Sequence, residues 1–351
     1  MRVLPLRLTQ GARTAGYALF GKLPNRADFV RIHVGHPVVQ EFERTLQEGL
    51  QAAAAEPGWE SRYDAAQALD FHYLAHDGDW IFIGVLLPSR DLSGRRYPLV
   101  GGAVLPVEAA GGGAHLAPIA YEVFFDGLRE QLRNAMENSV EALACRQFLE
   151  SHVQAGDGAA DVGLAQSVVA RHLTNQPAAR LAQLLADRQG ASLAQALLNL
   201  AFYQSFLRRF EHRASDQMIL LPLPQEKGEE ALAACAWLAL LGALWSGGRA
   251  ESSWRGTYWL SRGHAPVLAA TFRAMPKAYT KSIATGILGT GEAVLALGRE
   301  EAAWRAHPLY AETAYALDRL LADPALTVAE LAAFLEDIGR KLRREDVWLP
   351  A

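Results

Sequence analysis

Cysteine is scarce in this chain: only Cys145 and Cys235 occur among 351 residues. Both lie in segments of helical pattern, so we expect neither a disulfide framework nor a cysteine-rich zinc site. Long apolar runs are also lacking. The longest, residues 231–245, falls short of the ~20 residues that a membrane-spanning helix needs. This run therefore predicts a buried helix.

The chain also lacks an excess of positively charged residues. The chain has 34 Lys and Arg against 38 Asp and Glu, which gives a net charge of −4 at pH 7. Without a basic surplus, the sequence lacks the electrostatic footprint of nucleic-acid binding or of attachment to an anionic membrane. The N-terminal residues have no uninterrupted apolar stretch of the kind a signal peptide requires. We therefore expect a cytoplasmic protein with no membrane insertion.

Signatures of the common enzyme classes are missing too. There is no GxGxxG loop, Walker loop, GxSxG elbow or HExxH motif. One metal-like group remains, His72, His76, Asp77 and Asp79, in which imidazoles and carboxylates could act as ligands. An Asp-Gly turn between strands needs such residues for its backbone alone. We expect no catalytic residue, metal or cofactor, and keep a metal-dependent hydrolase as an alternative.

Hydrophobic periodicity predicts a mixed α/β (α+β) fold. Apolar residues recur every fourth position over residues 37–55, as in an amphipathic helix. Residues 68–75 alternate, and residues 80–87 are apolar at consecutive positions, so the two segments predict a hairpin with a strand buried on both faces. We expect a largely antiparallel central sheet flanked by helices, longin- or profilin-like, with a more helical second half.

A small, polar stretch at residues 155–163 has the composition of a linker. It divides the chain into two predicted domains, residues 1–154 and residues 164–351. Capping-box patterns mark helix starts in the second domain, at Ser192 with Gln195 and at Thr327 with Glu330.

Two charged segments between apolar strands hold the candidate site. Residues 20–31 read FGKLPNRADFVR, and residues 88–99 read PSRDLSGRRYPL. Glycine, proline and charges of both signs between strands are typical of a fixed, functional loop. The candidate partner-binding or loop-forming residues are Gly21, Lys22, Pro24, Arg26, Asp28, Arg31, Asp91, Gly94, Arg95 and Arg96.

Two interpretations of these loops stand side by side. In the first, the aspartates cap turns or pair with nearby arginines, and the prolines fix strand ends. In the second, the arginines donate bidentate hydrogen bonds to a partner's acidic surface or phosphorylated residue. We expect the loops to converge, with Asp28 meeting Arg95 or sharing a polar site with Lys22, Arg31 and Asp91.

Together the two segments resemble motifs of the TagF/ImpM family, which is associated with bacterial type VI secretion. That family reads GKLP-xx-GDFV and then PS-x-D-xx-GR-x-[FY]PL, and residues 257–263 and 272–276 give a third, looser match. Ala27 stands where the family usually has glycine. Alanine would strain the backbone there only if the position required a positive φ.

The resemblance implies a non-enzymatic regulator. The family acts as a post-translational repressor that opposes phosphorylation-driven activation of secretion and engages the cytoplasmic forkhead-associated scaffold protein. A structural adaptor for assembly of the secretion apparatus is the alternative. Some relatives resemble fusions to a serine/threonine phosphatase, but this chain lacks the second acidic-glycine motif that would complete a two-metal site.

Overall fold

The computed structural model describes residues 15–110, 113–138, 141–154, 162–209, 218–226, 228–246, 256–262, 265–271, 294–299 and 302–344. Within these residues eight strands form one sheet in the order β2-β1-β5-β4-β3-β7-β8-β6. Every neighbouring pair is antiparallel, which confirms the predicted mixed α/β fold with a largely antiparallel central sheet. The strands are β1 (Gly16–Gly21), β2 (Val30–Ile32), β3 (Leu69–Leu74), β4 (Trp80–Leu87), β5 (Leu99–Pro106), β6 (Ile219–Pro222), β7 (Tyr258–Ser261) and β8 (Val267–Ala270).

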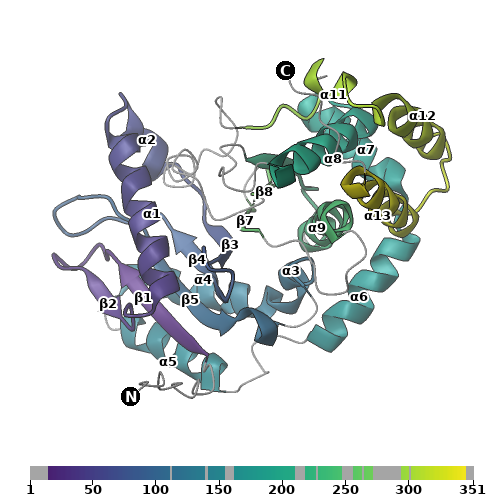
Figure 1. Cartoon of the computed structure of the whole chain (residues 1–351). Coiled ribbons are helices and arrows are strands. Elements are labelled where there is room, and N and C mark those ends of the chain that lie inside the picture. Colours follow the sequence, from purple (N-terminus) through teal and green to yellow (C-terminus); the bar gives the residue numbers. More distant parts are fainter. Residues whose placement is uncertain are drawn as a thin grey trace, which may run out of the picture.

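Helices cover both faces of the sheet and dominate the second half of the chain, as predicted (Figure 1). In the first half they are η1 (Val107–Ala110), α1 (Pro37–Ala54), α2 (Trp59–Asp64), α3 (Ala117–Ala120), α4 (Glu122–Glu137) and α5 (Glu141–Gln154). In the second half they are α6 (Val162–Asn175), α7 (Ala178–Gln189), α8 (Leu193–Arg209), α9 (Glu230–Ser246), α11 (Ala302–Arg305), α12 (Tyr310–Leu321) and α13 (Val328–Arg344).

The strand β4 lies between β5 and β3 and is buried on both faces, as its run of apolar residues predicts. Phe82 belongs to the apolar cluster beneath α1, whereas Ile81 and Ile83 belong to the cluster on the opposite face, with α4 and α5. The hairpin turn before β4 is closed by the backbone N–H of Asp79, which donates to Asp77 Oδ1 at 2.9 Å. The predicted hairpin is therefore present, and Asp77 shapes its turn.

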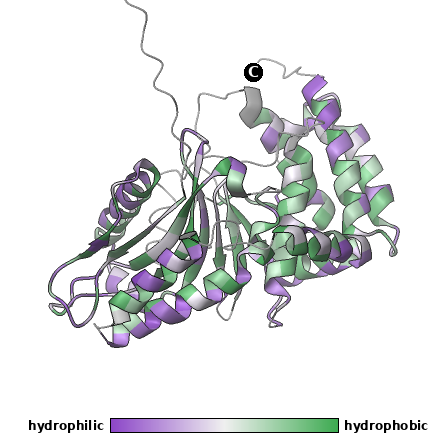
Figure 2. Cartoon of the chain, turned by 90° about the horizontal axis from the view of Figure 1, so that it is seen from below, coloured by the Kyte–Doolittle hydropathy of each residue, from purple (hydrophilic) through white to green (hydrophobic). Residues whose placement is uncertain are grey.

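The helices begin where the sequence signals them. Pro37 opens α1, and Thr327 and Glu330 form a reciprocal capping box before α13, with Glu330 N–H donating to Thr327 Oγ1 at 3.2 Å. The apolar run at residues 231–245 forms α9, which is mostly buried. Figure 2 shows largely hydrophobic strands and helices that carry both hydrophobic and hydrophilic residues. Among the described helices, none combines the length and apolar composition needed to cross a membrane.

The sheet runs across the predicted domain boundary. β3 in the first segment pairs with β7 in the second, with Asp70 opposite Leu260. The Asp70 carboxylate, 1% exposed, forms ion pairs with Arg129 of α4 at 2.5 Å and with Arg262, just after β7, at 3.0 Å. Strands of both segments thus share one sheet. The boundary itself stays a prediction, and residues 155–161 of the proposed linker lie outside the described part.

Candidate functional site

The two charged loops meet beside the sheet, because β1 ends and β5 begins at neighbouring positions of an antiparallel pair. The backbone N–H of Leu92 donates to the carbonyl of Arg26 at 2.9 Å. The hydroxyl of Ser89 donates to the carbonyl of Lys22 at 2.7 Å. The prediction that the loops converge is confirmed.

Asp91 is the centre of this junction, and its side chain is 0% exposed. Its Oδ2 accepts from Lys22 Nζ at 2.9 Å and from Arg95 Nε at 2.7 Å, while Oδ1 accepts the backbone N–H groups of Ser93 and Arg95. Burial alone would raise the pKa of Asp91, but the hydrogen bonds from Lys22 and Arg95 outweigh burial and hold this pKa well below its usual range. An ionised Asp91 therefore ties the first loop to the second.

The prediction that Asp28 contacts Arg95 is wrong. Arg95 pairs with Asp91, which lies four residues before it in the same turn, and its NH2 group donates to the carbonyl of Ala27 at 3.0 Å. Asp28 is exposed, and the described residues offer it no hydrogen bond or ion pair. Ala27 has a negative φ, because His33 is the only described non-glycine residue with a positive one. The departure from the family's glycine at this position is therefore unstrained.

Two glycines permit the junction. Gly21 has φ +132°, and a Cβ there would lie 2.1 Å from the carbonyl oxygen of Pro98, so only glycine lets the two backbones approach this closely. Gly94 has φ +79° in the turn of the second loop, where its N–H donates to the Asp91 carbonyl at 2.9 Å. Pro24 opens a tight turn in the first loop, which the N–H of Arg26 closes on the carbonyl of Leu23 at 3.1 Å.

A groove of about 450 Å³ opens beside the joined loops. The loops form one wall, and α1 and α2 form the other. The groove is lined by Lys22, Phe29, Arg31, Glu43, Gln47, Leu50, Gln51, Ala54, Trp59, Arg96 and Tyr97.

Carboxylates hold both groove arginines in place. Arg31 forms a bidentate pair with Glu43 of α1, at 2.6 and 2.8 Å. The prediction that Arg31 shares a polar site with Asp91 is therefore wrong. Arg96 forms a bidentate pair with Asp64 of α2, at 2.9 and 2.7 Å. Both guanidinium groups are therefore positioned before any partner arrives.

Aromatic rings line the same groove. Phe29, 40% exposed, packs edge-on against Tyr97 with the ring centroids 4.8 Å apart, and the Lys22 ammonium lies 5.4 Å from the Phe29 ring. Arg96 lies over Trp59 at 5.8 Å. The sequence reasoning missed Trp59 and Glu43, because only packing of α1 and α2 brings them to the loops. Another exposed apolar residue, Leu92, is 69% exposed in the second loop.

The two loop segments carry a surplus of positive charge, although the chain as a whole has a net charge of −4. Residues 20–31 and 88–99 contain six Lys and Arg but only two Asp, and one of those aspartates, Asp91, is buried. Arg95 and Arg31 expose 64% and 48% of their side chains. A partner with negative charge would be attracted to this surface.

The metal-like group of the sequence does not assemble. His72 is buried in β3 and stacks on Tyr258, whereas His76 and Asp77 lie exposed in the turn after that strand. Within the described ranges, no three His, Cys, Asp or Glu side chains are placed to hold a metal ion.

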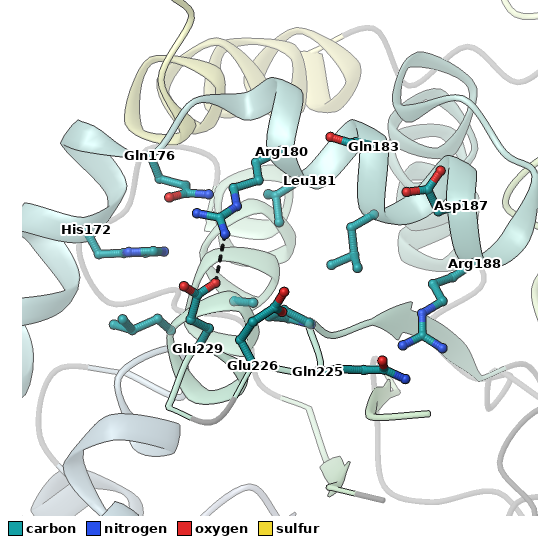
Figure 3. Close-up of a pocket in the computed structure, with 14 residues that line it drawn as sticks. His172, Gln176, Arg180, Leu181, Gln183, Asp187, Arg188, Gln225, Glu226 and Glu229 are labelled. Atoms are coloured by element: carbon teal, nitrogen blue, oxygen red, sulfur yellow. Dashed lines mark hydrogen bonds and ion pairs between the residues drawn. The ribbon is translucent and has the colours of Figure 1, made fainter. Parts of the chain in front are cut away.

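A second pocket, of about 490 Å³, lies between α6, α7 and the segment before α9 (Figure 3). Arg180 and Glu229 form an ion pair across it at 3.1 Å, with His172 beside them. Desolvation lowers the pKa of His172. Two arginines and three carboxylates line the pocket, so it has no excess of positive charge, and none of the motif residues contributes to it. The loop groove is therefore the stronger candidate site.

Comparison with known proteins places the loops and the groove in one recognised domain. Residues 18–152 match the family described as the TagF N-terminal domain, type VI secretion system-associated. A solved structure, PA0076 from Pseudomonas aeruginosa, is 26% identical, with the match covering 38% of this chain and 61% of that protein at a TM-score of 0.30. The similarity thus spans less than two thirds of PA0076. The comparison with curated protein sequences returns no match.

The matched segment begins within β1 and contains β2 to β5 and both charged loops, so the resemblance read from the motifs is confirmed. Residues 18–152 of this chain are therefore similar to the TagF N-terminal domain, which is associated with type VI secretion.

Proposed function

We propose that this chain is a non-enzymatic cytoplasmic regulator, which represses type VI secretion after translation by binding the forkhead-associated scaffold protein. The family domain supports a role in type VI secretion. The observation that carries the binding role is the rigid junction of the two loops, locked by Asp91, which presents exposed apolar and arginine side chains.

The lining of the groove has the composition of a binding surface. Arginine, tryptophan and tyrosine are the residue types that dominate binding energy at protein interfaces, and Arg96, Trp59 and Tyr97 line the groove together. Leu92, in the second loop, adds an apolar side chain that is 69% exposed.

A secretion assay separates repressor from adaptor. Deleting the gene should raise type VI secretion, and overexpressing the chain should lower it. Loss of secretion on deletion would instead establish the structural adaptor.

Pull-down of the forkhead-associated scaffold tests the surface. Leu92→Asp should abolish capture while leaving the thermal midpoint unchanged, because Leu92 is exposed. Tyr315→Asp is the matched control, since Tyr315 is 66% exposed on α12, outside the matched domain. Equal capture by wild type and Leu92→Asp would remove the loop surface from the proposal.

A non-enzymatic role has its own test. We expect the purified protein to hold no stoichiometric metal and to hydrolyse no generic phosphatase substrate, since its loop carboxylate Asp91 is committed to Lys22 and Arg95. Stoichiometric zinc, manganese or magnesium by elemental analysis, with turnover that depends on it, would favour the metal-dependent hydrolase.

A further inference from the structure

The groove beside the loops has a definite charge pattern. Its lining includes three cations, Lys22, Arg31 and Arg96, and one carboxylate, Glu43. Asp91 and Asp64, outside the lining, pair with Lys22 and Arg96. The three aromatic rings of Phe29, Trp59 and Tyr97 complete an apolar wall next to these charges. The groove therefore offers cationic donors and an apolar surface side by side.

Arg31 and Arg96 each have N–H groups that the ion pairs with Glu43 and Asp64 do not use. A guanidinium has five N–H groups, and Arg31 and Arg96 each use two of them on Glu43 and Asp64. The bidentate pairs fix each arginine's orientation, so a further carboxylate meets preorganised donors. Exposed ion pairs of this kind are worth only about 0–1 kcal/mol, so sharing the arginine costs little.

We infer that this groove binds an acidic segment of a protein partner, with carboxylates facing Arg31 and Arg96 and an apolar side chain against Trp59 and Phe29. The inference rests on the proposed function, because it assumes that the chain acts through a protein partner. It adds the chemistry of the segment that the partner presents.

The charge balance of the groove, in which Glu43 takes part, favours a carboxylate over a phosphate. The Glu43 carboxylate is 14% exposed and lies in the groove wall. Each of the three cations already has a carboxylate partner, so the groove has no net positive charge to offset the about −1.5 to −2 charges of a phosphorylated side chain at pH 7. The groove thus selects an acidic segment over a phosphorylated one.

Fluorescence anisotropy tests the inference with a labelled octapeptide that alternates glutamate with leucine, and with counterparts carrying glutamine or phosphoserine at the acidic positions. The glutamate peptide should bind the full chain, bind more weakly at about 300 mM than at about 50 mM NaCl, and bind more tightly than either counterpart. No binding of the glutamate peptide, equal binding of the glutamine peptide, or tighter binding of the phosphoserine peptide would overturn it.

Variants locate the binding. The double variant Arg31→Gln and Arg96→Gln should weaken glutamate-peptide binding at least about tenfold, a loss of about 1.4 kcal/mol. Arg180→Gln, which breaks an exposed ion pair in the other pocket, should bind as wild type does. Glu43→Gln keeps a side-chain oxygen that can accept from Arg31 and removes the repelling charge, so it should tighten binding, up to about fivefold. A purely structural role for Glu43 would not produce that gain.

Thermal unfolding checks that each variant is folded, and the lysine versions of Arg31 and Arg96 replace the double variant if it is not. A double variant that binds the peptide as wild type does would overturn the inference. The scaffold pull-down distinguishes failure of the groove assignment from failure of the proposed function. Capture of the scaffold by wild type and by the double variant alike would defeat only the groove assignment, whereas failure of wild type to capture it would defeat the proposed function.

Discussion

At the scale of single residues, Asp91 couples the shape of the loop surface to one buried charge. Its carboxylate receives Lys22 from one loop and Arg95 from the other. The alternating charges of the sequence identify all three residues. They could not show which aspartate is buried, because Asp28 and Asp91 have similar local surroundings and only the docking of the loops separates them.

Asp91→Asn should lower the thermal midpoint at neutral pH, because the Lys22 ammonium, 9% exposed, loses its counter-charge. The folded pKa of Asp91 lies below the unfolded value of about 3.9. The stabilisation is therefore present above about pH 4 and is lost as the pH falls toward the folded pKa. Thermal melts at neutral pH and near pH 3 should show the gap between variant and wild type narrowing in acid. A gap of constant size would contradict this assignment.

His72 gives a second pH dependence. Burial lowers its pKa to about 4, and its ring stacks on Tyr258 with the centroids 5.0 Å apart. The unfolded chain protonates this histidine near pH 6.5, so stability is lost as the pH falls from about 6.5 to about 4. His72→Phe keeps an aromatic ring and removes this titration.

The difference in unfolding free energy between wild type and His72→Phe should therefore shift by about 2 kcal/mol, against wild type, between pH 7 and pH 5. Urea unfolding at both pH values measures it. If the difference in unfolding free energy between the two proteins is the same at pH 7 and pH 5, burial does not lower the pKa of His72 in the folded state.

At the scale of helices and strands, local pattern determines much of the first half. The four-residue apolar repeat gives α1, and consecutive apolar residues give β4. α1 then packs its Phe42 ring against Phe71 and Phe82, with centroids 4.7 and 5.2 Å away. The pairing of β3 with β7 could not be predicted, because nothing local links strands so distant in the chain.

Phe82→Ala should cost about 3–5 kcal/mol of unfolding free energy, since the Phe82 side chain is 0% exposed and the aromatic cluster would retain a cavity. Denaturant unfolding of both proteins gives the difference. A cost below about 1 kcal/mol would place β4 at the surface.

At the scale of the whole molecule, the common sheet links the two predicted domains. β3 contributes Asp70, whose partner Arg262 follows β7, so hydrogen bonds and buried charge both cross between the segments. The linker composition at residues 155–163 suggests separation, but composition carries no information about strand pairing.

We expect calorimetry of the full chain to show a single cooperative unfolding transition, because loss of β7 would leave the Asp70 carboxylate with one fewer counter-charge. Arg262→Gln should lower the midpoint of that transition without splitting it. Two resolved transitions in wild type would establish residues 1–154 and 164–351 as independently unfolding domains.

The strand β7 is synthesised long after its partner β3, and this delay has a consequence for the newly made chain. Asp70 of β3 pairs with Leu260, about 190 residues further along the chain. At roughly 5–20 residues per second, a ribosome needs on the order of 10–40 s to make the intervening segment. During that interval the N–H and C=O groups on one edge of β3 are unpaired and can form hydrogen bonds with a strand of another chain. The newly made chain is therefore most prone to aggregate before translation ends, when its N-terminal domain is already complete.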